Sequence, residues 1–132
     1  MPTDVTQAQE TESFATHEAI AATLQQYVDA ARAGKGALMR QAFADTATVS
    51  GTYAGKKVVW TRQEFCDLID KGGPVENLDA RVVAIEYQGN AGMARLEARN
   101  WRGTRYTDFF VLLKQGDAWQ IDSKVFFAHS RA

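Results

Sequence analysis

The segment from Tyr106 to Phe127 constrains the fold of this chain more than any other. Ten of its 22 residues are β-branched or aromatic, and they fall in two runs that are interrupted at Gln115-Gly116-Asp117. Two runs of this composition, separated by a connector with glycine and aspartate, predict a β-hairpin. Asp108 and Lys124 lie inside the two runs. An unpaired charge in such a place costs several kcal/mol or changes its protonation state, so this pair needs a structural partner or a role in a site.

The register of the hairpin decides whether the two charges meet. If the connector is the three residues Gln115–Asp117, Lys114 faces Ala118 and Asp108 lies opposite Lys124. A ladder shifted by one residue would break this pairing. The sequence therefore leaves two interpretations open, a structural salt bridge and a pair of residues in a pocket.

The rest of the chain predicts one α+β domain. Residues 1–12 are polar and predict a flexible tail, and residues 13–132 form the domain. Apolar spacing and capping residues predict three helices, over residues 13–33 (capped by Ser13 or Thr16), 36–44 and 62–72. A turn is predicted at Asp45-Thr46. Four strands are predicted over residues 48–53, 57–60, 79–87 and 91–101. Thr61 and Glu64 form a capping box at the start of the third helix. This order predicts helices on a strongly curved, mostly antiparallel sheet, which makes a cone with an internal pocket.

Charge and composition exclude several classes of partner. The net charge is −1, and Lys and Arg are scattered, so nothing favours binding to nucleic acid or to an anionic membrane. No apolar run is long enough to span a bilayer, and no secretory signal is recognisable. The His, Cys and carboxylate residues lack metal-ligand spacing, and there is no phosphate-binding loop. We therefore expect a cytoplasmic protein without a metal or cofactor.

Two parts of the chain carry a family resemblance. The first is residues 26–34 followed by 41–49, and the second is residues 106–114 with 116–121 and 124–126. Together they resemble the nuclear transport factor 2-like superfamily, which has a cystatin-like fold and includes ketosteroid isomerases and small polyketide cyclases. The second part is most similar to the branch called putative lumazine-binding proteins. The resemblance covers about residues 14–128. It implies the cone fold and a homodimer formed through the sheet.

Ketosteroid isomerases supply the closest comparison for chemistry. They use a tyrosine of the first helix and a protonated aspartic acid of a late strand as an oxyanion hole, with a third carboxylate as base. The resemblance implies that Tyr27 and Asp108 are the two donors, so both are candidate catalytic residues. The base falls at or next to Gly51, where no side chain can take a proton from carbon. Glu97 and Asp122 are the other candidates for a base.

Aromatic and basic residues complete the candidate site. Met93, Arg95, Glu97, Arg99 and Trp101 share one face of their strand, a pattern typical of a solvated or dimer-forming face. A contact between Arg99 and an anionic ligand is the alternative. The candidate ligand-binding residues are Tyr53, Trp60, Phe65, Arg99, Trp101, Tyr106 and Lys124.

These features leave three functions open. The first is a small-molecule-binding protein with an aromatic pocket and an unknown ligand. The second is a cofactor-independent isomerase, cyclase or dehydratase acting on a carbonyl or polyketide-like substrate. The third is a non-catalytic dimerisation or accessory domain. An ammonium group at Lys124 would hold Asp108 ionised and unable to donate to an oxyanion, which argues against an isomerase.

Overall fold

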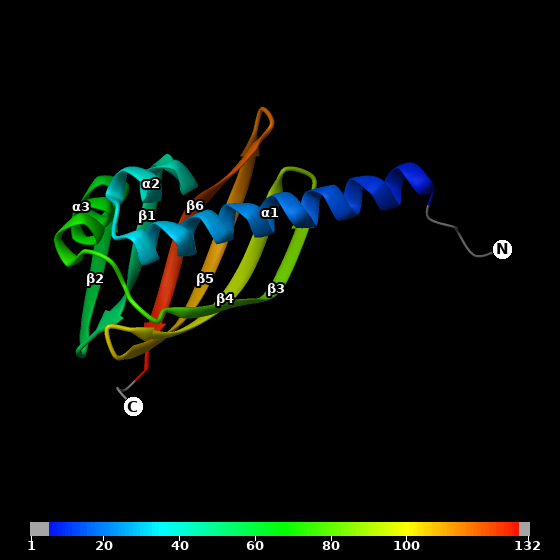
Figure 1. Cartoon of the computed structure of the whole chain (residues 1–132). Coiled ribbons are helices and arrows are strands. Elements are labelled where there is room, and N and C mark those ends of the chain that lie inside the picture. Colours follow the sequence, from blue (N-terminus) through cyan, green and yellow to red (C-terminus); the bar gives the residue numbers. More distant parts are fainter. Residues whose placement is uncertain (1–5, 130–132) are drawn as a thin grey trace.

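Three helices cover one face of a six-stranded sheet in the computed structural model, which describes residues 6–129 (Figure 1). The helices are α1 (Gln7–Ala33), α2 (Gly36–Ala42) and α3 (Arg62–Gly72). The strands are β1 (Phe43–Tyr53), β2 (Lys56–Thr61), β3 (Asp79–Gln88), β4 (Ala91–Trp101), β5 (Thr104–Gln115) and β6 (Ala118–Ala128). The α+β architecture predicted from the sequence is confirmed.

The sheet has the order β2-β1-β6-β5-β4-β3. All neighbouring strands run antiparallel except β1 and β6, which are parallel. This parallel contact joins the N-terminal strand pair to the C-terminal meander. It therefore places residues of β1 beside the β5–β6 hairpin that carries Asp108 and Lys124.

The first helix is longer than predicted. Thr6 and Gln9 form a capping box, so α1 begins at Gln7, and the caps predicted at Ser13 or Thr16 are wrong. The first turns of α1 project beyond the sheet (Figure 1), and residues 7–15 are all exposed. Residues 6–12 of the predicted flexible tail are thus a cap and helix, and residues 1–5 lie outside the described part.

The starts of α3 and β1 test two further predictions. The predicted capping box of α3 is confirmed, because the Thr61 hydroxyl accepts a hydrogen bond from the Glu64 amide at 3.1 Å and the Glu64 carboxylate accepts one from the Thr61 amide at 2.9 Å. The turn predicted at Asp45-Thr46 is wrong, since both residues belong to β1. The ladder between β1 and β6 is irregular between Phe43 and Thr48, which explains why this part of the strand lacks regular alternation.

The β5–β6 hairpin has a different register from the one predicted. Gln115 pairs with Ala118, so the turn consists of Gly116 and Asp117 alone. Val111 then pairs with Ser123 and Leu112 with Ile121, which leaves Asp122 as an unpaired bulge residue. Phe110, and not Asp108, lies opposite Lys124.

The bulge keeps Lys124 on the inner face. The shorter turn moves the ladder by one residue, which alone would send Lys124 to the outer face of the sheet. The bulge at Asp122 shifts the ladder by one further residue, so the side chain of Lys124 faces inward again. The burial pattern records this change, because Trp119 and Ile121 are buried before the bulge, and Lys124 and Phe126 are buried after it.

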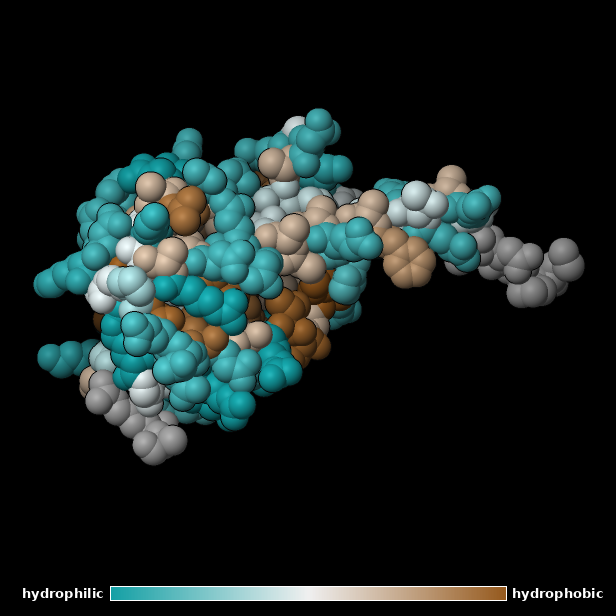
Figure 2. Space-filling view, viewed as in Figure 1, coloured by the Kyte–Doolittle hydropathy of each residue, from teal (hydrophilic) through white to brown (hydrophobic). Residues whose placement is uncertain are grey.

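The core lies between the helices and the inner face of the sheet. Figure 2 shows hydrophobic side chains gathered below α1, toward the strands, with hydrophilic residues over most of the remaining visible surface. The largest fully buried side chains are Tyr27, Phe43, Phe110, Ile20, Leu24, Met39, Leu96, Ile121, Val49, Asp108 and Cys66. Asp108 is the one ionisable carboxyl in this group.

Candidate functional site

A cavity of about 270 Å³ opens between α3 and the inner face of the sheet. Its ten lining residues come from α3, from β1, β2, β4, β5 and β6, and from the turn after β4. They are Tyr53, Trp60, Phe65, Leu68, Ile69, Trp101, Arg102, Tyr106, Lys124 and Phe126. Six of the seven predicted ligand-binding residues belong to this lining, with Arg99 the exception.

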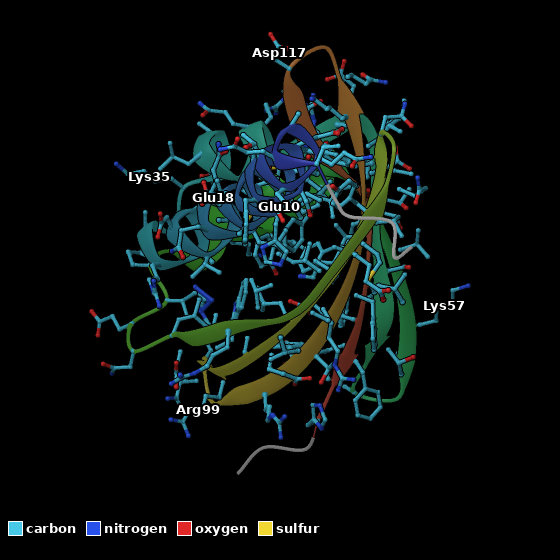
Figure 3. All side chains as sticks on the ribbon, turned by 90° about the vertical axis from the view of Figure 1, so that its right-hand side faces the viewer. Glu10, Glu18, Lys35, Lys57, Arg99 and Asp117 are labelled. Carbon is cyan, nitrogen blue, oxygen red and sulfur yellow. The ribbon has the colours of Figure 1, made fainter. Side chains whose placement is uncertain are left out.

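Arg99 lies away from the cavity. Its guanidinium pairs with Asp79 of the neighbouring strand, with Nε 2.8 Å from Oδ2, and its side chain is 68% exposed. Figure 3 shows Arg99 at the periphery of the sheet, pointing to solvent. The structure therefore gives Arg99 the surface ion pair and leaves the predicted contact with an anionic ligand without a geometric basis.

Trp101 reaches the cavity because β4 is irregular at its end. Simple alternation places Trp101 on the outer face with Arg95 and Arg99. The ladder between β4 and β5 shifts between Ala98 and Trp101, and Asn100 has a φ of 64°. This shift turns the indole inward, where its ring centroid lies 6.0 Å from that of Tyr27.

Four lining residues were missed by sequence reasoning: Leu68, Ile69, Arg102 and Phe126. Two signals could have found three of them. Phe126 alternates with Lys124 along one strand face, and Leu68 and Ile69 follow Phe65 at helical spacing. Arg102 follows β4 in a turn with a φ of 51°, and no local pattern indicates its direction.

Lys124 is the central polar group of the site. It is buried, and its ammonium nitrogen is surrounded by four aromatic side chains at 4.7–5.5 Å from the ring centroids: Tyr27, Phe65, Trp101 and Phe126. Three of these rings also line the cavity. The ammonium therefore lies at the cavity wall, stabilised by the faces of the rings that surround it.

Tyr27 and Asp108 lie behind Lys124. Lys124 Nζ donates a hydrogen bond to the Tyr27 hydroxyl, and this hydroxyl donates to Asp108 Oδ2 at 3.3 Å. Lys124 Nζ lies 3.9 Å from the same carboxyl oxygen. Both Tyr27 and Asp108 are fully buried, and neither is among the residues that line the cavity. The structure thus brings the two predicted donors together, with Lys124 between them and the cavity.

Burial dominates the protonation of this trio. Desolvation raises the pKa of Asp108 above its usual value, and the nearby Lys124 lowers it by a smaller amount. Desolvation likewise lowers the pKa of Lys124, against the opposing effect of Asp108. Burial, followed by Asp108, raises the pKa of Tyr27. Lys124 thus acts on Asp108 in the predicted sense, toward the ionised form, but loss of water has the larger effect on the pKa of Asp108.

The position of the isomerase base is filled by packing. A Cβ atom on Gly51 would lie 2.5 Å from the Phe126 carbonyl oxygen and 2.7 Å from its ring. Phe126 in turn stacks on Trp60 with an interplanar angle of 10°. A carboxylate at residue 51 would thus require these rings to move.

The other candidate bases also lie elsewhere. Glu97 accepts hydrogen bonds from Arg95, Arg105 and Thr107, and Asp122 is exposed in the bulge. None of the residues that line the cavity is a carboxylate. A base that acts on a ligand in this cavity would have to be a neutral amine or a phenolate.

The described part of the chain offers neither a metal-binding cluster nor a membrane-spanning helix. Between residues 6 and 129, no three His, Cys, Asp or Glu side chains are grouped so that they could hold a metal ion. Within the same residues, each helix is too short or too polar to cross a bilayer.

Comparison with known proteins places these features in a family. The sequence profile of the family described as “Putative lumazine-binding” matches residues 15–127. A protein called Aldolase FrzH from Cladobotryum sp. is 25% identical over 116 residues, which cover 87% of this chain and 93% of that protein.

Two solved structures of NTF2-like proteins of unknown function have the same fold at 30% identity. The protein from Methylobacillus flagellatus KT has a TM-score of 0.83 and is matched over 98% of this chain and 99% of its own. The protein from Shewanella baltica OS155 has a TM-score of 0.82, with 96% and 99% covered.

Proposed function

This chain belongs to the putative lumazine-binding family of nuclear transport factor 2-like proteins, and we propose that it binds a small, flat, mostly apolar molecule in the cavity described above. The observation that carries this proposal is the lining of the cavity. Six of its ten residues are aromatic, and a buried ammonium lies at its wall. Apolar clefts with a few convergent polar groups are typical of ligand sites.

The aromatic rings favour a planar ligand. Trp60 stacks on Phe126 at a centroid distance of 6.0 Å and on Phe65 at 6.3 Å. Tyr106 meets Phe126 edge to face, at 5.7 Å. Rings arranged in both orientations around one space offer faces and edges to a conjugated molecule.

The charges of the lining favour a ligand with a carbonyl or anionic oxygen. Lys124 and Arg102 are the charged residues of the lining, and both are basic. Arg102 is partly held by the carbonyl oxygen of Gly73, to which it donates at 2.7 Å. A volume of about 270 Å³ is close to the lower end of small-molecule pockets, which suits a ligand of one or two fused rings.

Ligand screening tests this proposal. Saturation-transfer NMR and thermal shift against pterins, flavins, aromatic acids and aromatic ketones should identify at least one class that raises the melting temperature. Ile69→Trp should fill the cavity and abolish the effect. Leu38→Trp, on the exposed side of α2, is the matched control and should leave binding unchanged. Failure of every class to bind, or equal binding by Ile69→Trp, would overturn the proposal.

A carbonyl-processing enzyme is the second candidate. Two observations favour it: Lys124 places an amine against the cavity, and one relative is called an aldolase. The isomerase-type variant has less support, because the position of its base falls at or next to Gly51, where no carboxylate is present. Turnover of an aromatic aldehyde or ketone that is lost in Lys124→Met would support an enzyme, and binding without turnover would leave a binding protein.

The outer face of the sheet supports a homodimer. Phe109 and Val111 of β5 and Val125 and Phe127 of β6 are 46–56% exposed and lie on adjacent strands. Such a group of large apolar side chains is typical of a protein interface. We propose that a second copy of the chain covers this face. A dimer that binds no small molecule would instead favour the accessory-domain function.

A further inference from the structure

We propose that Lys124 is a nucleophilic amine, which condenses with an aldehyde or ketone held in the cavity to form a Schiff base. The inference deepens the proposed function and rests on it, because the carbonyl compound must first enter the cavity. It assigns the chemical class of the ligand and a covalent role for one residue. The contacts of Lys124 carry the argument.

The first argument is position. Phe65, Trp101 and Phe126 surround Lys124 Nζ and also line the cavity, so a carbonyl carbon against these rings lies within reach of the nitrogen. Five other lysines occur in the chain, Lys35, Lys56, Lys57, Lys71 and Lys114, and all of them are exposed. Figure 3 shows Lys35 and Lys57 at the periphery, pointing to solvent.

The second argument is the path for a proton. Lys124 Nζ donates to the Tyr27 hydroxyl, which donates to Asp108 Oδ2. A proton can therefore leave the ammonium for the tyrosine oxygen while the tyrosine proton moves to the carboxylate. The result is a neutral amine and a protonated Asp108, with Tyr27 unchanged.

The third argument is that burial favours this neutral pair. Desolvation lowers the pKa of Lys124 and raises that of Asp108, and both directions disfavour the ionised forms. A desolvated lysine in an apolar pocket is the usual way in which proteins obtain a nucleophilic amine near neutral pH.

The fourth argument is that the trio is poorly arranged for a purely structural ion pair. Buried ion pairs stabilise a fold when their geometry is close and their remaining polar atoms are satisfied. Lys124 Nζ is 3.9 Å from Asp108 Oδ2, and Asp108 Oδ1 has no hydrogen-bond partner among the described residues. A carboxyl that must take up and return a proton accounts for both features.

The reaction balances with these groups alone. The lone pair of the neutral Lys124 amine attacks the carbonyl carbon, and a C–N bond forms as the C=O π bond breaks. One proton moves from the nitrogen to the former carbonyl oxygen. Asp108 then returns its proton through Tyr27 to the nitrogen, from which a second proton passes to the same oxygen. The C–O bond then breaks and water leaves. The products are an iminium ion on Lys124 and a carboxylate on Asp108, which together form an ion pair.

Reductive trapping tests the inference on the full chain. The protein is incubated with 4-hydroxybenzaldehyde and sodium cyanoborohydride near neutral pH, and the modified lysines are identified by peptide mass mapping. We expect Lys124 to be labelled at least about tenfold faster than any exposed lysine, because an exposed ammonium is stabilised by hydration. Lys124→Met and Lys124→Arg should both lose this fast labelling.

A second variant separates positioning from structure. Tyr27→Phe keeps the buried ring and removes the proton path, so labelling of Lys124 should slow on the order of 10²-fold. Binding of 4-hydroxybenzamide, which does not form a Schiff base, should be unchanged in this variant. Equal labelling rates in Tyr27→Phe and the unmodified protein would overturn the proposed role of Tyr27.

The benzamide also distinguishes the two proposals from each other. If it binds and Ile69→Trp blocks it, but no adduct forms on Lys124, then the Schiff-base inference fails and the binding function stands. If it does not bind and label is confined to the exposed lysines, both fail for this class of ligand. If Lys124 is labelled fast and Ile69→Trp blocks this labelling, the result supports both the binding function and the Schiff-base inference.

Discussion

Lys124 lies diagonally across the β5–β6 ladder from Asp108, with Phe110 directly opposite it. This arrangement depends on Asp122, the bulge residue that turns Lys124 back to the inner face. The diagonal leaves room for the Tyr27 hydroxyl between the two charged groups.

The bulge gives a deletion experiment. Deletion of Asp122 removes the bulge residue, and Ile121, Lys124 and Phe126 still face inward because the alternation of β6 is then regular. Deletion of Val125 shifts the alternation by one residue and turns Phe126 outward. We expect the Val125 deletion to be less stable by about 2–3 kcal/mol or more, the value of burying one large apolar side chain. Urea unfolding measures both. An equal loss of free energy of unfolding in the two deletion variants would contradict the assigned register.

A double-mutant cycle measures the buried pair. Asp108→Leu or Lys124→Met alone should cost about 3–5 kcal/mol, because each leaves a buried partner uncompensated. The double variant should lose less than the sum of the two. Asp79 and Arg99, which form a closer but exposed pair, provide the control cycle and should show almost no coupling. Additive losses at Asp108 and Lys124 would show that the two groups do not interact.

The stability should depend on pH through Lys124. Its pKa is lowered by burial in the folded protein, so the stability it contributes is present above the unfolded value, about 10.4, and is lost as the pH falls through the folded value. The comparison uses Asp108→Asn, which removes the opposing carboxylate, with and without Lys124→Met. The free energy of unfolding of the double variant should exceed that of the single variant by an amount that grows as the pH is lowered from about 10.4, by at most about 1.4 kcal/mol per pH unit. Chemical denaturation of both variants measures this difference, and a difference independent of pH would refute the lowered pKa.

Gly51 should tolerate no side chain. Gly51→Ala brings a Cβ atom against the carbonyl and ring of Phe126, so it should destabilise the fold by about 1–3 kcal/mol. Adding Phe126→Leu should recover part of this loss by relieving the contact with the ring. Thr52→Ala, one residue along the same strand and exposed, is the control. Thermal unfolding that is unchanged in Gly51→Ala would disprove the close packing.

The proposed dimer can be separated from the fold. Val125→Glu places a charge in the middle of the exposed apolar face, and it should convert a dimer to a monomer in sedimentation velocity. Leu38→Glu changes a similarly apolar residue on the helix side and should leave the assembly intact. A monomer for the unmodified chain at all concentrations would rule out this interface.

Local signals in the sequence account for most of the elements. The capping box at Thr61 and Glu64 determined the start of α3, because it depends on residues three positions apart. The alternation that predicted a solvated or dimer-forming face for Arg95, Glu97 and Arg99 leaves the opposite face of β4 to Ala94, Leu96 and Ala98, and these three residues are buried. Six of the seven predicted ligand-binding residues line the cavity, and four of the six are large aromatic residues at or near strand ends: Tyr53, Trp60, Trp101 and Tyr106. Whether they bind a ligand stays a prediction.

The misplaced features depend on contacts that are distant in the sequence or on single-residue irregularities. The extension of α1 to Gln7 follows from a cap at Thr6 in a segment with no apolar face to reveal it. Trp101 reaches the cavity through a shift in the β4–β5 ladder, which simple alternation cannot foresee. The direction of the pKa shift at Asp108 required its burial to be known, because a neighbouring charge and desolvation act in opposite senses.

The sequence by itself determined that an apolar hairpin would carry Asp108 and Lys124, and that an acid and a base in such a segment would need each other or a site. It could not determine how they meet, because one residue of register decides the face on which a side chain lies. The tertiary structure decided that by combining a two-residue turn with a bulge at Asp122. It also placed Tyr27 of a distant helix between the two groups and set Lys124 against the cavity.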